Sequence, residues 1–391
     1  MKTGTHLGKR TAKIPAGVDL RFTGTVSDGV WFSRSVLRAA LLLGQPVPRD
    51  RKPDNVADRY GAKLRFWLAS EPSISCLLVA ILFCGLISGC RSSNSRTIAV
   101  IPRTTANELW ESVHKGAETA GRQTGFHIYW NAPTREDDIE RQVGLVEKVI
   151  NDRPAGLVLA PDHYLALVGP VRRAMSQQIP TVIISSPLPI PPGKGLSYIL
   201  NDDQETGRLA AMRVGMLLKG KGAVGIVGLA TKVMSIMVRA RAFEAALSSN
   251  FPQISIVARE EGSPNIAELQ QITGEMLVNY PQLDAILALD PVATTGTLDQ
   301  LRALGKTGSI KLIGCDQETA LMFLVRQGEV DSVIIQNSNE MGSLAVRWIA
   351  ARTRGEAVPD KVELTPVLVN KSNIDSPEIQ RLLAVDWRSS R

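Results

Sequence analysis

Short, wholly apolar runs alternate with amphipathic stretches from about residue 97 onwards. Continuous apolar strands are typical of parallel sheets that are buried on both faces. Such strands are expected at residues 97–102, 126–130, 156–160, 180–184, 196–199, 223–227, 254–258, 285–289, 311–315, 331–336 and 362–368. Between them, apolar residues recur every three to four positions, which predicts amphipathic helices. These helices are expected at residues 108–124, 136–152, 164–176, 205–219, 233–249, 267–280, 294–304, 319–326 and 340–354. The alternation predicts an α/β fold.

A Pro- and Gly-rich stretch at residues 187–195 divides this alternation into two similar series. The second series already fills a sheet of its own, so the late helix is expected to return to the first half. We therefore expect two lobes with parallel sheets, joined by several hinge strands and separated by a cleft. The N-terminal lobe would comprise residues 97–200 plus 337–365, and the C-terminal lobe residues 201–336 plus 366–374.

The N-terminal quarter has a different pattern. Lys63 and Arg65 precede an apolar run at residues 74–86, which small residues and Cys90 follow. This order is typical of a secretory signal, and the run is shorter than the roughly 20 apolar residues of a membrane-spanning helix. The small residues before the cysteine resemble the bacterial lipobox, so we expect residues 61–90 to be a lipoprotein signal peptide with lipidation at Cys90. An uncleaved signal anchor and a buried apolar helix remain open.

Residues 1–60 lack helical or strand periodicity and hold the signal away from the start of the chain. Export signals normally begin a chain. We expect this segment to be either a disordered tail or an extension upstream of the true translation start.

The charge distribution argues against a nucleic-acid partner. The net charge is +7, but residues 1–90 contain 13 Lys/Arg and 6 Asp/Glu, which leaves 32 of each after Cys90. No stripe of basic residues with interleaved aromatics follows the cut. Of the four cysteines, only Cys315 would remain inside the fold, as a small core residue. No His has metal-ligand spacing with another His or Cys, so neither a metal nor another cofactor is expected.

Five polar residues lie at or just after the ends of expected strands: Asn107, Ser185, Asp290, Asp316 and Gln336. Ligands of open parallel sheets bind beyond the carboxyl ends of the strands, so these side chains are expected to share one space. Carboxylates and amides there suit a hydroxyl-rich ligand. Structural roles remain open, because Asn107, Asp290 and Asp316 could each cap a following helix.

Two weaker motifs do not support other functions. The glycines between residues 220 and 225 match G-x-G-x-x-G, but they precede an expected strand, whereas the dinucleotide fingerprint follows one. No G-x-S-x-G elbow exists in the sequence. We therefore read the first as a turn and find no support for hydrolase chemistry.

Several segments together resemble the type I periplasmic sugar-binding proteins of the ribose-binding group, which are relatives of the sensor lobes of LacI-type repressors. The resemblance covers residues 97–374 in order, and it depends on the order and spacing of its segments. These are residues 97–102 with Asn107 and Trp110, then 239–243, 287–290, 312–316 and 333–336. The resemblance implies two Rossmann-like lobes, three hinge crossings and a sugar closed into the cleft.

The resemblance also implies roles for individual residues. Asn107 would hydrogen-bond the ligand, Trp110 would pack against the C–H face of the sugar, and Arg239 would donate to its oxygens. Asp290 and Asp316 would accept from hydroxyls, and Gln336 would bridge at the hinge. A core position remains open for Trp110, and one of Arg239 and Arg241 must be a solvated surface charge.

The chain departs from the family pattern at several positions. Ser185 and Ser186 stand where the family commonly has an Asp-Arg pair, Leu109 replaces a second aromatic residue, and Pro291 replaces an acid. The ligand is therefore not restricted to ribose. It could offer fewer hydroxyls or a different ring size.

The expected function is that of a non-catalytic, monomeric solute-binding lipoprotein in the periplasm or at the cell surface. It would bind a sugar-like ligand between its lobes and present the closed form to an ABC permease or a membrane sensor. Two alternatives remain open: a LacI-type regulator, which would need an N-terminal helix-turn-helix, and an enzyme acting on a nucleoside through Asp290 and Asp316.

Overall fold

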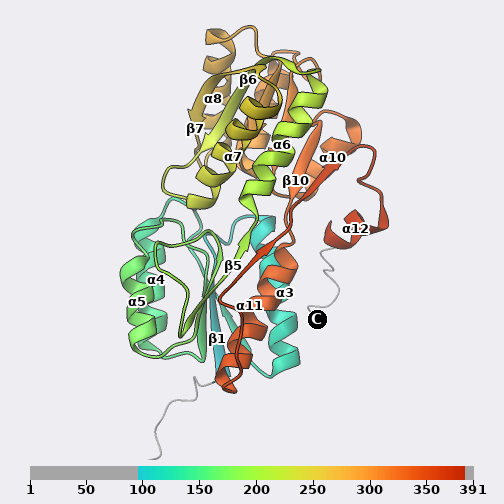
Figure 1. Cartoon of the computed structure of the whole chain (residues 1–391). Coiled ribbons are helices and arrows are strands. Elements are labelled where there is room, and N and C mark those ends of the chain that lie inside the picture. The colour runs from blue at the N-terminus through green and yellow to red at the C-terminus, as the bar shows by residue number, and fades with distance from the viewer. Residues whose placement is uncertain (1–95, 384–391) are drawn as a thin grey trace, which may run out of the picture. The chain divides into compact units, whose positions relative to one another are not determined.

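The computed structural model describes residues 96–383 (Figure 1). The expected extension at residues 1–60, the signal peptide at 61–90 and its Cys90 all lie outside the described residues. Within the described range, no helix combines the length and the apolar character that crossing a bilayer requires.

The first sheet has six strands in the order β11-β5-β4-β3-β1-β2, and all its pairings are parallel. Its strands are β1 (Thr97–Ile101), β2 (His127–Trp130), β3 (Gly156–Leu159), β4 (Thr181–Ser185), β5 (Leu196–Asn201) and β11 (Lys361–Leu364). Helices α3 (Glu108–Thr124) and α11 (Ser338–Thr353) cover one face, and α4 (Ile139–Asn151) and α5 (Val168–Ser176) cover the other. We call this part the N-terminal lobe.

The second sheet also has six strands, in the order β12-β10-β9-β8-β6-β7. They are β6 (Lys221–Leu229), β7 (Gln253–Glu261), β8 (Ala285–Ala288), β9 (Lys311–Cys315), β10 (Ser332–Ile335) and β12 (Val367–Asn370). Helices α6 (Asp203–Leu217) and α7 (Met234–Asn250) cover one face. The other face is covered by α8 (Ile266–Asn279), α9 (Pro291–Ala303), α10 (Thr319–Gln327) and α12 (Pro377–Leu383). We call this part the C-terminal lobe, and Figure 1 shows both sheets with their helices.

The chain passes between the two sheets three times: from β5 to α6, from β10 to α11 and from β11 to β12. The single strand expected at residues 362–368 was wrong. It is two strands in different sheets, because β11 runs parallel to β5 whereas β12 runs antiparallel to β10. Pro366 lies between them, where its missing N–H would break a continuous ladder.

Most other expected elements are confirmed, with bounds that shift at some strand ends and helix ends and at several helix starts. The helix expected to begin at residue 294 begins at Pro291, because Asp290 is its N-cap and proline suits the first turn. The helix expected from residue 164 begins only at Val168. The α/β class with two mostly parallel sheets is as predicted, and Cys315 is a buried thiol of β9 whose pKa burial raises to about 12.

Helices α6 and α7 approach each other closely where the site is built. A Cβ added to Gly207 would lie 2.3 Å from the carbonyl oxygen of Arg239. Only glycine permits this distance, so Gly207 brings the start of α6 against the middle of α7. That contact places Asp203 beside Arg239.

Candidate functional site

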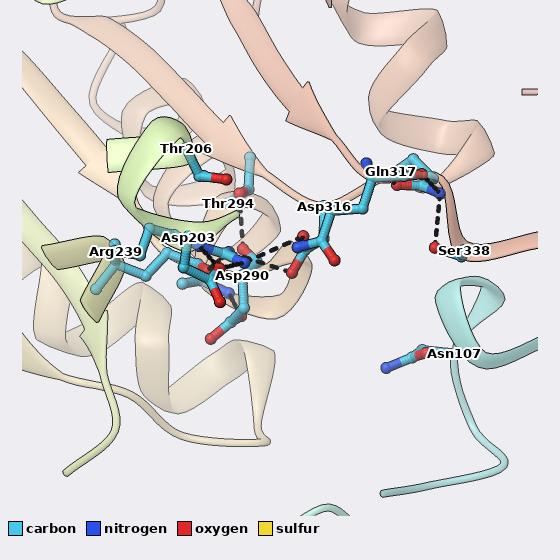
Figure 2. Close-up of polar contacts among 12 residues, drawn as sticks. Asn107, Asp203, Thr206, Arg239, Asp290, Thr294, Asp316, Gln317 and Ser338 are labelled. Carbon is cyan, nitrogen blue, oxygen red and sulfur yellow. Dashed lines mark hydrogen bonds and ion pairs between the residues drawn. The ribbon is translucent and has the colours of Figure 1, made fainter. Parts of the chain in front are cut away.

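Arg239 is the centre of a buried ion-pair cluster in the C-terminal lobe. Its side chain is 2% exposed and donates to Asp203 Oδ1 at 2.9 and 3.2 Å, to Asp316 Oδ2 at 3.2 Å and to the Leu289 carbonyl at 2.7 Å. Figure 2 shows these side chains together, with Asn107 apart from them on a separate helix. Breaking a buried pair by removing one partner leaves an uncompensated charge, so Arg239 and its two carboxylates depend on one another. Arg241 on the same helix is exposed, as expected of one of the two arginines.

Asp316 follows β9 with a left-handed backbone conformation, φ 66°. Its Oδ1 accepts a hydrogen bond from the Gln336 side chain at the β10–α11 crossing. The alternative that Asp316 caps α10 is wrong, because Glu318 is the N-cap residue of that helix. The turn instead directs Asp316 to Arg239 and Gln336.

Gln317 holds the backbone of the same crossing. Its amide nitrogen donates to the Gln336 carbonyl at 2.9 Å and to Ser338 Oγ at 3.1 Å, and its Oε1 accepts from Gln336 N–H at 3.0 Å. The side chain therefore pairs with the chain as it leaves the C-terminal lobe. Sequence analysis did not identify Gln317, although it directly follows Asp316.

Asp290 caps α9, as the structural alternative proposed. Its Oδ1 accepts from Ala293 N–H at 2.7 Å, and the structure records no hydrogen bond to its Oδ2. Burial raises the pKa of Asp290 to about 6, and the negative charges of Glu136 and Asp316 act in the same direction. A capping carboxylate with one free oxygen can also contact a ligand.

Asn107 and Trp110 in the N-terminal lobe share one acceptor. Asn107 Oδ1 accepts from Trp110 N–H at 3.2 Å, so Asn107 caps α3. The Asn107 amide and the Trp110 indole N–H both donate to Glu136 Oε1 at 3.1 Å. Trp110 is 1% exposed, so its ring belongs to the core of this lobe.

Arg103 is a charged residue of the site that sequence analysis missed. It is 6% exposed, lies 5.2 Å over the Trp110 ring, and approaches Glu136 Oε2 at 3.8 Å. Its Nε is buried without a partner. Burial alone would lower the pKa of Arg103, but nearby carboxylates of both lobes raise it: Glu136, Asp162, Asp316 and Asp290. Its position directly after the first strand was the available signal.

Asp162 follows β3 and is a second residue that the sequence analysis missed. It is 4% exposed, and its Oδ2 has no hydrogen-bond partner. Burial raises the pKa of Asp162 to about 8, although Arg103 opposes the shift. Gln142 fixes this loop, because it accepts from Asp162 N–H at 3.0 Å and donates to the Pro102 and Ala160 carbonyls.

Besides the Gln317–Ser338 bond at the β10–α11 crossing, three hydrogen bonds join the two lobes within residues 96–383. Glu108 Oε2 accepts from Thr319 N–H at 2.6 Å, and Tyr164 N–H donates to the Lys232 carbonyl at 3.1 Å. Ser186 Oγ accepts from Ser235 N–H at 3.2 Å. The neighbouring Ser185 is 5% exposed with φ 66°. The lobes are therefore in contact around the charged cluster.

The family model described as a periplasmic binding protein domain matches residues 98–357. The chain belongs to the periplasmic binding protein family. Among curated proteins it is similar to the D-ribose/D-allose-binding protein of Pseudomonas aeruginosa, at 26% identity over 69% of this chain and 87% of the relative. It is also similar to the D-allose-binding periplasmic protein of Escherichia coli K12, at 24% identity over 70% of this chain and 90% of the relative.

Solved structures confirm the fold of this binding protein. An ABC transporter solute-binding protein from Agrobacterium vitis with bound D-fucose has a TM-score of 0.68 and 28% identity, over 73% of this chain and 98% of that one. A carbohydrate transporter solute-binding protein from Agrobacterium radiobacter in complex with D-arabinose has a TM-score of 0.71 and 23% identity, over 75% and 100%. The type I periplasmic binding protein architecture implied by the sequence is thus confirmed.

Of the predicted site residues of this binding protein, three are joined by contacts: Arg239, Asp316 and Gln336. Asn107 and Trp110 bond to Glu136, whose negative charge acts on Arg103 and Asp290. No recorded hydrogen bond joins Asn107, Trp110, Asp290 or Ser185 directly to those three residues. Their roles toward a ligand stay predictions.

A cavity of about 970 Å³ borders the binding protein's α6 and α7. Asn201, Asp203 and Ser235 contribute to its lining, but Asn107, Asp290, Asp316 and Gln336 do not. We therefore place the candidate ligand site at the charged cluster rather than in this cavity. Across residues 96–383, no group of three or more His, Cys, Asp or Glu side chains is arranged to hold a metal ion.

Proposed function

We propose that this protein is the non-catalytic solute-binding component of an ABC transporter, and that it encloses a sugar or sugar-like polyol between its lobes. The observation that carries the proposal is the pair of buried polar atoms without partners in the charged cluster: Arg103 Nε and Asp162 Oδ2. Buried polar groups are normally hydrogen-bonded. A polyhydroxylated ligand would supply the missing donors and acceptors.

The names of the curated relatives support the same ligand class. Both are described as binding proteins for D-allose, and one also for D-ribose. The site of this chain is compatible with hydroxyl groups, because Asp290 keeps a free carboxylate oxygen and Arg103 a free N–H. Ser185, Asn107 and Gln336 would complete the contacts around the ligand.

Ligand binding would select the closed arrangement. A ligand that touches residues of both lobes, such as Arg103 and Asp290, has contacts in the closed state that the open state cannot offer. The Gln317 network would guide the β10–α11 crossing as the lobes move. The closed form would then be presented to an ABC permease, or to a membrane sensor.

We place the protein outside the cytoplasm, held at the membrane by a lipid on Cys90. The basic, apolar and small segments before that residue support this placement. Stable anchoring takes more than one acyl chain, as a diacylglyceryl group would provide. We expect the anchored protein to act as a monomer.

The experiment is a thermal-shift screen of the purified protein against pentoses, hexoses, polyols and nucleosides. A sugar at 100 times its dissociation constant would add about 2.7 kcal/mol to the free energy of unfolding. Chemical analysis of the recovered ligand would show it unchanged. Binding of no polyhydroxylated compound, or conversion of the ligand into a product, would contradict the proposal.

A further inference from the structure

The charged cluster between the lobes contains more acid than base. Two guanidinium groups, of Arg103 and Arg239, lie among five acidic side chains, Glu136, Asp162, Asp203, Asp290 and Asp316, of which Asp162, with its pKa raised to about 8, is mostly protonated at neutral pH. Four acids therefore remain for two guanidinium groups. A neutral sugar would leave this imbalance in place.

Arg239 has no capacity left for a ligand anion or for the remaining acids. It donates to Asp203, to Asp316 and to the Leu289 carbonyl, and it is 2% exposed. One positive charge therefore faces two negative ones, and the Gln336 amide stabilises only one of them. The side chains that the C-terminal lobe contributes to the cluster therefore contain more carboxylates than guanidinium groups even without Asp290.

Arg103 neutralises only part of the negative charge that the N-terminal lobe contributes to the cluster. Its nearest carboxylate is Glu136, at 3.8 Å, and Glu136 already accepts from Asn107 and Trp110 through its other oxygen. Asp162 is 4% exposed and keeps an unpartnered oxygen although it lies within the field of Arg103. This orphaned polar atom is independent of the charge imbalance and indicates that a hydrogen-bond partner is missing.

Asp290 is the carboxylate best placed to receive a cation. Its Oδ1 is used by the α9 cap, while its Oδ2 has no recorded hydrogen bond. Negative charges act on it from both lobes, from Glu136 and from Asp316, and the positive charge of Arg103 acts in the opposite direction. An ammonium group at Oδ2 would therefore be attracted by three carboxylates against one guanidinium group, and charge-assisted hydrogen bonds are the stronger kind.

We infer that the enclosed ligand is an aminated sugar or aminated polyol, whose protonated amine binds Asp290 Oδ2 while its hydroxyl groups bind the remaining polar atoms. This inference rests on the proposed function and deepens it. Burying a carboxylate without a counter-charge is costly, and a cationic ligand removes that cost whereas a neutral one does not.

The test is isothermal titration at pH 7.5 with matched pairs that differ in one group: D-glucosamine and D-glucose, D-galactosamine and D-galactose, and an inosamine and its parent inositol. We expect the amine of at least one pair to bind more tightly than its parent by on the order of tenfold or more, as for a desolvated charge pair. The N-acetylated amine, which is neutral, should lose this advantage.

The matched variants are Asp290→Asn and Asp375→Asn. Asparagine is also a good N-cap, so Asp290→Asn should keep α9 and abolish the preference for the amine. Asp375 is an exposed partner of Arg326, so Asp375→Asn changes the net charge equally and should keep the preference.

Three other results would each reject part of the proposal. If the neutral parent binds as tightly as its amine in every pair that binds, the inference is wrong and the proposed function stands. If the preference persists in Asp290→Asn, the assignment to Asp290 is wrong. If neither the pairs nor the wider sugar panel bind at all, both the inference and the proposed function fail.

Discussion

Glu108 of the N-terminal lobe caps a helix of the C-terminal lobe, because its Oε2 accepts from Thr319 N–H at 2.6 Å. The N-cap residue of α10, Glu318, makes no side-chain cap of its own. A carboxylate at a helix N-terminus satisfies a free N–H and interacts favourably with the helix dipole. This bond therefore exists only while the lobes are in contact, and it favours the closed state.

Replacing Glu108 by Ala is expected to weaken closure without unfolding either lobe. Loss of a helix cap costs about 1 kcal/mol, so the affinity for the sugar found by screening should fall about fivefold, mainly through faster dissociation. Stopped-flow kinetics would measure this change. Glu111→Ala, on the same helix but paired with His114, is the control. Equal dissociation rates for the two variants would contradict the role of Glu108.

Replacing Arg239 by Met should destabilise the fold itself. The change leaves Asp203 and Asp316 buried without their counter-charge, which costs about 3–5 kcal/mol. Denaturant unfolding would measure it, with Arg241→Met as the exposed control on the same helix, expected within about 0.5 kcal/mol of the wild type. Arg239→Lys should rescue only part of the loss, because lysine cannot form the planar fork. A wild-type midpoint for Arg239→Met would refute this account.

The sequence predicted those parts of the site that depend on residues close together in the chain, namely the strand and helix bounds and the helix caps. The strand at residues 311–315 and the helix at 108–124 have the bounds expected, because their apolar periodicity is uninterrupted. Helix-capping roles for Asn107 and Asp290 were predicted as alternatives to ligand binding. A cap depends only on residues within one turn of the helix start, so the local sequence shows it.

The parts of the site that the sequence did not predict depend on contacts between segments that are distant along the chain. Asp203 pairs with Arg239 only because Gly207 lets α6 approach α7, and no local signal encodes that pairing. Arg103 was missed because its burial depends on Trp110 and on Glu136, 33 positions further along the chain. The left-handed turn at Asp316, which directs it away from α10, is likewise set by tertiary contacts.

Replacing Asp162 by Asn should stabilise the protein at alkaline pH. The folded pKa of Asp162, about 8, lies above the unfolded value of about 3.9, so the folded state binds more protons between these values. Stability should therefore fall as pH rises through this window. Above it the cost in the free energy of unfolding reaches at most about 6 kcal/mol, at about 1.4 kcal/mol per pKa unit.

Thermal unfolding from pH 4 to pH 9 would measure the Asp162 effect. The Asn variant, which keeps the shape but not the charge, should match the wild type at pH 4 and exceed it at pH 9. Asp375→Asn, which changes an exposed carboxylate, should show no such divergence. A constant difference between Asp162→Asn and the wild type across this range would exclude titration of Asp162 as the cause.

Glu318 should make closure depend on pH. Burial raises the pKa of Glu318 to about 7, and the carboxylates of Glu108 and Asp290 add to the shift. Glu108 belongs to the other lobe, so opening should return the pKa toward its usual value of about 4.3. The closed state then binds more protons between these values, and closure becomes less favourable as pH rises from about 4.3 to about 7.

The variant Glu318→Gln removes this dependence. The ratio of its ligand affinity to that of the wild type should be near one at pH 4.5 and should increase to a plateau above pH 7. Using the ratio reduces the contribution of Asp290, which titrates in both proteins. Fluorescence titration across this range would measure it, and a ratio that stays flat would show that the repulsion between Glu318 and Glu108 does not oppose closure.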